Sequence, residues 1–375
     1  MDNLHFSRGP LLQCKLADYP LDDSFRIQWL DLWEKSPYHS PFNRLEWIEI
    51  GIELYGKHKQ VLPMRFFDQS GILVSMGIFH LVEEQGRLGK HTVIRTIEYN
   101  SQRILPVLAK DTATMAKAMQ ALYIQYPHCL DYFDFYKLDS LGDELSDLKN
   151  HLNNIPLAFS CSIFNEQPQL LLNLPWEEYL AERTQGHRKK IRRYTRKLQE
   201  EYSDYQFLRF RTNEEFEAHG IETLLSEIMQ VYCIGWQGES LSKEGETLKL
   251  LTTFYRRVAL AFIPLGLMDI CLLKSDNKLL AFELNICDKD VVHMMFGSYD
   301  REYAQWSPGN AILSEIIQDS LCRGYKRIEF GGEYLEYKKL WAKDSSNSYQ
   351  IRIYGKSPQA TVKKWIHQIK NLIKR

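Results

Sequence analysis

The chain has 375 residues, of which 44% are hydrophobic and 25% are charged. This composition is typical of a globular protein with enough apolar side chains for a packed core, and the length predicts about two domains. The 47 Lys and Arg residues nearly balance the 48 Asp and Glu residues, so the total charge gives no indication of a polyanionic partner.

The cysteines and the N-terminal residues indicate a cytoplasmic protein. The seven cysteines are widely spaced and form neither a CxxC pair nor a zinc-ligand pattern, so we expect reduced thiols and no metal. The opening residues, MDNLHFSRG, lack the basic start and apolar core of a signal peptide. The most apolar stretch, 258–273, contains Pro264, Gly266 and Asp269 and is shorter than the roughly 20 residues that a membrane span needs.

The first half of the chain alternates between helical and strand patterns. Phe25, Trp29 and Trp33 recur at helical spacing, and the turn residues of segment 68–71 join two apolar runs as in a β-hairpin. The helices expected in this half cover 24–35, 44–54, 112–126 and 142–152, and the expected strands cover 61–67, 72–82, 92–99, 130–138 and 157–164.

The second half repeats this order of elements. Its expected helices cover 221–235, 246–258, 308–321 and 333–342, and its expected strands cover 207–211, 267–274, 279–287, 291–299, 327–330 and 348–355. The repetition predicts a duplicated fold with domains 1–165 and 166–375, the first of them degenerate. A chance agreement between two mixed α/β domains is the alternative.

A strongly basic segment lies between the halves. The run RTQGHRKKIRRYTRK at 183–197 is rich in Lys and Arg, and its apolar residues Ile191, Tyr194 and Leu198 share one narrow stripe of an amphipathic helix, 187–202. One interpretation is a solvated linker helix. The other is that its cations, Arg188 and Arg192 among them, hold phosphates of a cofactor, an acyl carrier or RNA, with a tRNA lying along 187–197.

The common catalytic signatures are absent, since the sequence has no GxSxG, HExxH or P-loop motif. One candidate anion site remains at the start of the helix that follows strand 291–299. Pro308 and Gly309 leave backbone N–H groups there without side-chain cover, which favours a phosphate. The residues of this candidate cofactor site are Ser307, Pro308, Gly309, Asn310 and Ala311.

Three antiparallel strands, this helix start and a following strand resemble the acyl-CoA site of the GNAT acyltransferase superfamily. The strings HRKKIRRYTRKLQEE, WQGES, GSYDREYAQWSPGNAIL and FGGEYLEYKKLWA resemble, in order and spacing, the CelD-type branch related to the FemABX aminoacyltransferases. The resemblance covers 166–356 well and the N-terminal half more loosely. It implies an α/β (α+β) fold of two tandem GNAT-like domains, each a mixed, mostly antiparallel sheet flanked by helices. One departure concerns the phosphate loop, where three residues separate Gln305 from Gly309 and the superfamily pattern has two.

The resemblance also implies catalytic residues in the last string. Lys338 matches the lysine that stabilises developing negative charge in the FemABX relatives, and its neighbour Tyr337 is a further catalytic candidate. Glu333 and Glu336 are a candidate base and an acceptor-binding carboxylate. The non-catalytic alternatives are that Lys338 is an ordinary surface lysine and that Glu336 forms an ion pair with Lys338 or Lys339 on the same helix.

Three further residues are candidates for binding the acceptor: Trp236, Tyr299 and Asp300. Trp236 lies in the loop between the two helices that lead the second domain, a region that covers acceptors in this fold. Asp300 follows Tyr299 at a strand end, where it binds an acceptor or starts a turn. His293 lies in the same apolar strand and is expected to be a core histidine rather than a general base.

The resulting hypothesis is an acyltransferase that moves an acyl group from a CoA-type thioester to an amine or hydroxyl. The acceptor would be a small molecule, a sugar or a peptide, and an acyl carrier protein is a further candidate donor. One alternative is a FemABX-like aminoacyltransferase that uses aminoacyl-tRNA. The other is a non-catalytic scaffold that binds RNA or protein.

Overall fold

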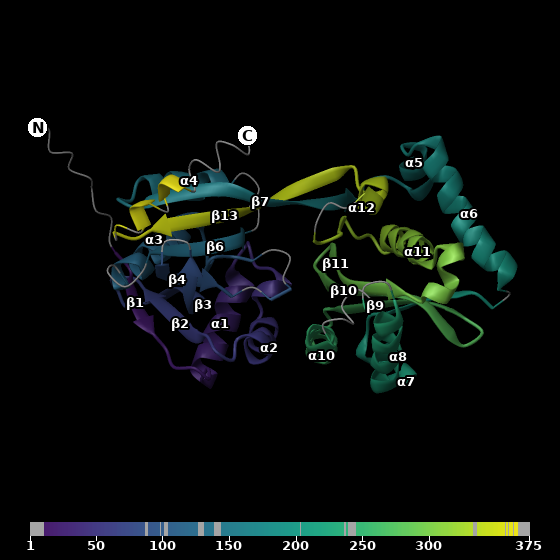
Figure 1. Cartoon of the computed structure of the whole chain (residues 1–375), viewed down its shortest axis with the longest axis horizontal. Coiled ribbons are helices and arrows are strands. Elements are labelled where there is room, and N and C mark those ends of the chain that lie inside the picture. Colours follow the sequence, from purple (N-terminus) through teal and green to yellow (C-terminus); the bar gives the residue numbers. More distant parts are fainter. Residues whose placement is uncertain are drawn as a thin grey trace, which may run out of the picture. The chain divides into compact units, whose positions relative to one another are not determined.

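The structure is a computed structural model that describes residues 11–86, 89–97, 99–100, 104–126, 131–138, 144–202, 204–235, 238, 245–332, 336–356, 358, 360–362 and 364–366 (Figure 1). Contacts between residues divide the chain into two units. Unit 1 comprises 1–165 and 347–375, and unit 2 comprises 166–346.

Two long strands each contribute to both units: β7 (Ala158–Leu171) and β13 (Asp344–Tyr354). The strand expected at 157–164 therefore continues past Pro168 without a break. Residues 347–375 were expected in the second domain but lie in unit 1, because β13 pairs from Tyr349 to Tyr354 with a strand of unit 1, β6 (Tyr132–Leu138).

Unit 1 is a mixed sheet with helices packed against it. Its strands follow the order β1, β2, β3, β4, β6, β13, and only β4 and β6 among these pairs run parallel. The remaining elements are β1 (Gln13–Leu16), α1 (Asp23–Lys35), η1 (Pro41–Asn43), α2 (Leu45–Tyr55), β2 (Gln60–Phe67), β3 (Leu73–Gly86), β4 (Gly89–Thr96), β5 (Leu108–Ala109), α3 (Thr112–Gln125) and α4 (Glu144–Asn153).

Helix α1 illustrates how the sequence pattern becomes packing. The three aromatic residues that predicted this helix, Phe25, Trp29 and Trp33, are its buried residues. The side chain of Asp22 accepts a hydrogen bond from the Phe25 backbone N–H at 2.6 Å, which satisfies one of the open donors at the helix start. Burial of one face and a capped start together explain why the helix begins here.

Unit 2 repeats the arrangement of unit 1. From β8 the order is β9, β10, β11, β12 and β7, and only β11 and β12 run parallel. Its elements are α5 (Trp176–Ala181), α6 (Gln185–Glu201), β8 (Gln206–Phe210), α7 (Asn213–His219), α8 (Ile221–Ile234), α10 (Gly245–Phe262), β9 (Met268–Ser275), β10 (Lys278–Asp288), β11 (Val291–Tyr299), η2 (Arg301–Trp306), α11 (Pro308–Cys322), β12 (Arg327–Glu329) and α12 (Glu336–Trp341). The predicted fold class is confirmed.

Helices cover both faces of the unit 2 sheet (Figure 1). On one face, α11 buries Ile312, Ile316 and Ile317 in a core that also contains Ile191 of α6. On the other face, the rings of two tyrosines from α8 and α10 lie against Phe296 of β11. The neighbour of Phe296, Gly297, therefore faces α11, because side chains alternate between faces along a strand.

Candidate active site

The two parallel strands of unit 2 pair over a short distance and then part. Val291 to His293 of β11 pair with Arg327 to Glu329 of β12, and β11 continues to Tyr299 without β12 beside it. A β-bulge follows the last pair, since Leu284 and Asn285 of β10 oppose Phe296 and Met294 and leave Met295 as the extra residue. Bulges bend the strand that carries them and recur beside active sites.

A glutamate of β10 lies beside the place where β11 and β12 separate. Glu283 pairs with Gly297 of β11 and with Cys271 of β9, and Cys271 belongs to the core formed with α11. A Cβ atom at Gly297 would overlap the Glu283 carboxyl group, so the carboxyl fills the space above this glycine. Burial raises the pKa of Glu283 to about 8, against the opposing effect of the Lys338 charge.

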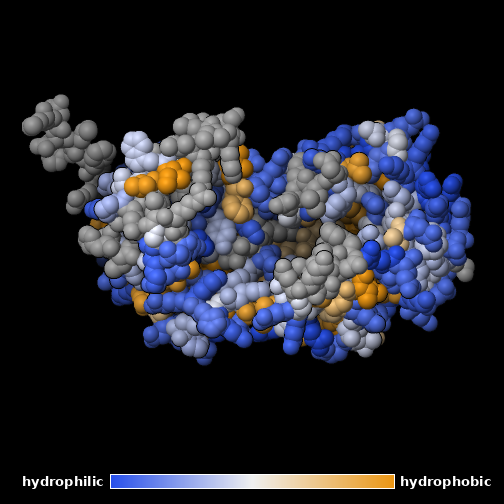
Figure 2. All heavy atoms as spheres, in the orientation of Figure 1, coloured by the Kyte–Doolittle hydropathy of each residue, from blue (hydrophilic) through white to orange (hydrophobic). Residues whose placement is uncertain are grey.

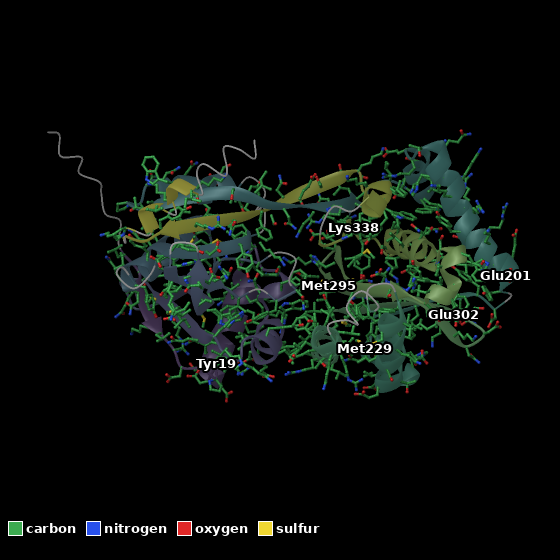
Figure 3. All side chains as sticks on the ribbon, viewed as in Figure 1. Tyr19, Glu201, Met229, Met295, Glu302 and Lys338 are labelled. Atoms are coloured by element: carbon green, nitrogen blue, oxygen red, sulfur yellow. The ribbon has the colours of Figure 1, made fainter. Side chains whose placement is uncertain are left out.

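The predicted lysine reaches the same place from α12. Lys338 is 7% exposed, and its Nζ atom donates to the carbonyl oxygens of Phe330 and Gly331 at 3.1 and 2.5 Å. Gly331 and Gly332 both have φ of 58°, the left-handed conformation that favours glycine. This turn presents its carbonyl groups to the lysine directly after β12, and Figure 3 labels Lys338 on α12.

Tyr337 completes the cluster. The Nζ atom of Lys338 lies 5.9 Å from the centre of the Tyr337 ring. Although Tyr337 is 48% exposed, partial burial of its hydroxyl group and the charge of Glu283 raise its pKa, so this hydroxyl keeps its proton at neutral pH. A carboxyl group, an ammonium group and a phenol therefore converge where β11 and β12 part.

The side chains of the other two predicted glutamates, Glu333 and Glu336, lie outside the described part of the chain. Glu333 lies outside the described residues. Glu336 begins α12, and only its backbone belongs to the described part of the chain.

The predicted cofactor site lies at the start of α11. Ser307 has a left-handed backbone and caps the helix without a side-chain hydrogen bond. Its carbonyl oxygen accepts from the N–H groups of Asn310 and Ala311 at 3.0 and 3.2 Å, and Pro308 has no N–H. The helix start thus offers fewer open donors than the sequence suggested, with the Gly309 N–H at the centre of what remains.

Two aromatic residues connect this helix start to the rest of the site. A Cβ atom at Gly309 would lie 3.2 Å from Cδ1 of Tyr299, so the ring at the end of β11 lies against the first turn of α11. Trp341 donates from Nε1 to Oδ1 of Asn310 at 3.3 Å. Trp341 and Lys338 both belong to α12. This short helix therefore carries a catalytic candidate and also contacts the first turn of α11.

The corresponding helix of unit 1 has a different start. Asp111 caps α3, and its carboxylate accepts from the Thr114 N–H at 2.7 Å. A carboxylate at this position repels an anion, whereas the start of α11 carries no acidic residue in its first turn. Of these two helices, only α11 suits a phosphate.

The structure gives other partners to three predicted residues. Asp300 accepts from the Glu302 N–H at 3.0 Å and caps η2, which is its turn role. Arg188 donates to the Ala181 carbonyl at 2.9 Å, and Arg192 pairs with Glu177 at 3.2 Å. Arg188 and Arg192 therefore both contact α5. Trp236 lies outside the described residues.

Part of the basic helix nevertheless keeps a cationic face. Ile191 and Leu198 are buried, which confirms the narrow apolar stripe. The cations on the exposed side make no ion pair or hydrogen bond with any residue that the structure describes; they are Lys189, Lys190 and Arg193. The surface over α6 is accordingly hydrophilic in Figure 2.

Comparison with known proteins places this site in a family context. Residues 185–339 match the model of the acetyltransferase (GNAT) domain. None of the curated proteins matches the sequence.

Within the described ranges, no group of three His, Cys, Asp or Glu side chains could hold a metal ion, and no helix is long and apolar enough to cross a bilayer.

Three solved structures share the fold over most of their length. FemX superposes with a TM-score of 0.56 at 11% identity, covering 90% of this chain and 98% of FemX. A conserved protein of unknown function from Bacteroides thetaiotaomicron superposes with a TM-score of 0.55 at 13% identity, covering 91% of this chain and 100% of that protein. The C-terminal domain of an Agrobacterium fabrum protein named as a lysylphosphatidylglycerol synthetase superposes with a TM-score of 0.51 at 13% identity, covering 90% of this chain and 94% of that domain. At such identities the likeness concerns the fold.

Proposed function

We propose that the chain, whose residues 185–339 match the acetyltransferase (GNAT) domain model and whose fold is similar to that of FemX, transfers an acyl group from a CoA-type thioester to an amine or hydroxyl. The acceptor is a small molecule, a sugar or a peptide. The observation that carries this proposal is Glu283, whose pKa of about 8 suits a general base near neutral pH.

The protein must assist three chemical events in this reaction. The attacking nitrogen or oxygen must lose a proton, the carbonyl oxygen must be stabilised as it becomes negative, and the sulfur must leave as a thiol. Glu283 accepts the proton as the new bond to the carbonyl carbon forms. Lys338 stabilises the negative oxygen by its charge, and Tyr337 donates a proton to the sulfur as the carbon–sulfur bond breaks.

The position of Lys338 fits a stabilising role better than that of a base. Its ammonium group is held by two backbone carbonyls, which favours the charged form and fixes its place. A fixed charge needs no reorganisation when the oxyanion forms, which is the main source of electrostatic stabilisation in enzymes. A half-buried carboxyl group beside a buried ammonium group also argues against a non-catalytic scaffold.

The test is thiol release from acyl-CoA donors of increasing chain length, with panels of amines and hydroxyl compounds as acceptors. We expect turnover for at least one pair and a loss of about 10²-fold to 10⁴-fold in E283Q, because this variant keeps the shape but cannot accept a proton. If E283Q turns over at the wild-type rate, Glu283 is not the base. Acyl carrier protein is tested as a donor in the same assay.

A second donor is favoured by a specific observation, the cations on the exposed face of α6 that have no partner within the described ranges of the chain. Lys189, Lys190 and Arg193 suit a polyanion such as aminoacyl-tRNA. The triple charge reversal to Glu should weaken tRNA binding strongly and flatten its salt dependence, and should leave acyl-CoA turnover unchanged. Both donors are intracellular compounds, so we propose a cytoplasmic location.

A further inference from the structure

Arg183, between α5 and α6, is a buried cation without an anionic partner among the residues that the structure describes. It is 8% exposed, and its guanidinium group lies over the ring of Tyr179, 4.3 Å from the ring centre. No carboxylate or carbonyl of the described residues accepts a hydrogen bond from it, and its Nε atom is buried without a partner. The adjacent Glu182 pairs instead with Lys343, at 2.7 Å. Buried charges in proteins are normally paired.

His187 lies one helical turn further along and has the same deficiency. It is 6% exposed, and both of its ring nitrogens are buried without a hydrogen-bond partner in the described part of the chain. Burial and the charges of Arg183 and Lys190 lower its pKa, which also shows that Arg183 is near the imidazole. Buried polar atoms are nearly always satisfied by protein, water or ligand, so two unsatisfied groups side by side indicate a missing acceptor.

Both residues flank the first turn of α6. Thr184 caps the helix by accepting from the His187 N–H at 3.3 Å. The N–H groups of Gln185 and Gly186 have no partner among the described residues, and nothing lies within 4 Å of a Cβ atom built on Gly186. Open donors at the start of a helix of 17 residues attract anions through hydrogen bonds and the helix dipole.

The surroundings connect this place to the donor site. The ring of His187 contacts the edge of Trp341, with ring centres 5.1 Å apart, and Trp341 binds Asn310 in the first turn of α11. The starts of α6 and α11 are therefore joined through a single indole. Tyr179 strengthens the same junction by donating to the Trp341 carbonyl oxygen at 2.9 Å.

We propose that Arg183, His187 and the first turn of α6 form a binding site for a phosphate group. A phosphate suits these groups because it accepts several hydrogen bonds and carries the negative charge that Arg183 lacks. The source of the phosphate is either the nucleotide end of the acyl donor or inorganic phosphate. The first source rests on the proposed function, whereas the site itself does not.

The test measures binding by calorimetry at constant ionic strength with three probes: inorganic phosphate, pyrophosphate and adenosine 3′,5′-bisphosphate. The test variant is Arg183→Met, which keeps the length of the side chain but removes its charge. The matched control is Arg196→Met, which removes an exposed charge from the same helix. We expect at least one probe to bind the wild type, with affinity reduced about tenfold or more in R183M and by less than about twofold in R196M.

The pattern of probes identifies the source. Binding of the bisphosphate but not of inorganic phosphate supports the nucleotide end of the donor, and binding of inorganic phosphate alone supports the free anion. The proposal is overturned if no probe binds the wild type or if R183M binds like the wild type. Because binding needs no turnover, E283Q should bind the probes normally, so loss of the proposed catalysis and loss of this site are separate results.

A second measurement covers the case in which R183M fails to fold. The imidazole signals of His187 in the wild type are followed by NMR as the pH changes, with and without pyrophosphate, and assigned with His187→Gln. A bound anion near Arg183 should raise the pKa of His187. An unchanged titration at saturating pyrophosphate contradicts the proposal.

Discussion

The carboxyl group of Glu283 occupies the space above Gly297, its partner on the neighbouring strand, so that only a hydrogen atom fits as the side chain at position 297. This relationship fixes the carboxyl group where β11 and β12 part. It also explains why a glycine stands within a strand, where glycine is intrinsically unfavourable.

Gly297→Ala should therefore displace the carboxyl group. We expect turnover to fall by at least about tenfold and the free energy of unfolding to fall by about 1–3 kcal/mol, because the added methyl group overpacks the site. Thiol release and urea unfolding measure the two effects. Gly245→Ala is the control, because nothing lies within 4 Å of a Cβ atom there. Wild-type turnover in G297A would show that the carboxyl position is unimportant.

The raised pKa of Glu283 predicts how activity depends on pH. The base must be ionised, so kcat/KM should rise with pH and level off above about 8. The rise should disappear from the residual activity of E283Q. A profile that levels off near the ordinary glutamate pKa, about 4.3, would contradict the assignment.

The same group makes stability depend on pH in the opposite direction. Between the unfolded pKa of about 4.3 and the folded pKa of about 8, the native protein binds the proton that the unfolded chain has lost. The Glu283 contribution to the free energy of unfolding is therefore full below this window and falls as pH rises through it. Urea unfolding at several pH values measures the free energy of unfolding of the wild type and of E283Q. The wild type should lose stability relative to E283Q as pH rises through this window, and the absence of such a relative loss would show that Glu283 titrates normally.

The order of helices and strands could be predicted from the sequence because apolar periodicity records which face is buried. The pairing of the last strand could not. The apolar alternation of β13 suits either sheet, and its hydrogen bonds with β6 depend on long-range packing. Glu283 was also missed, because one acidic residue within LLAFELNIC reads as ordinary strand alternation. The glycine opposite it was a signal, but only the strand register connects the two. Lys338 was found through resemblance, and its carbonyl partners became known only from the structure.

Lys338 provides the next prediction. Lys338→Met should reduce turnover by about 10²-fold to 10³-fold, the range seen when a stabiliser of an oxyanion is removed. Its KM for the acyl donor should change little, because the charge acts in the transition state. Lys339→Met, which removes an exposed neighbour on the same helix, should retain activity. A higher KM with unchanged kcat in K338M would indicate donor binding instead of catalysis.

A buried ion pair beneath α11 gives a prediction about stability alone. Arg209 of β8 donates to both carboxylate oxygens of Asp269 at 2.9 and 2.7 Å, and its side chain and that of Asp269 are 2% and 0% exposed. Asp319 at the end of α11 accepts from the same guanidinium group at 2.8 Å. The pair therefore ties the edge strand of unit 2 to the helix whose start forms the cofactor site.

Removing Asp269 leaves the buried guanidinium group of Arg209 with a single anionic partner, Asp319, whose side chain is 29% exposed. Asp269→Ala should lower the free energy of unfolding by about 3–5 kcal/mol. The exposed pair of Arg196 and Glu200, with side chains 69% and 66% exposed, provides the control, and Arg196→Ala should change stability by less than about 1 kcal/mol. Urea unfolding of both variants measures the contrast. Equal effects would mean that Asp319 alone neutralises Arg209, and the double variant D269A/D319A would then lose the stability that D269A retains.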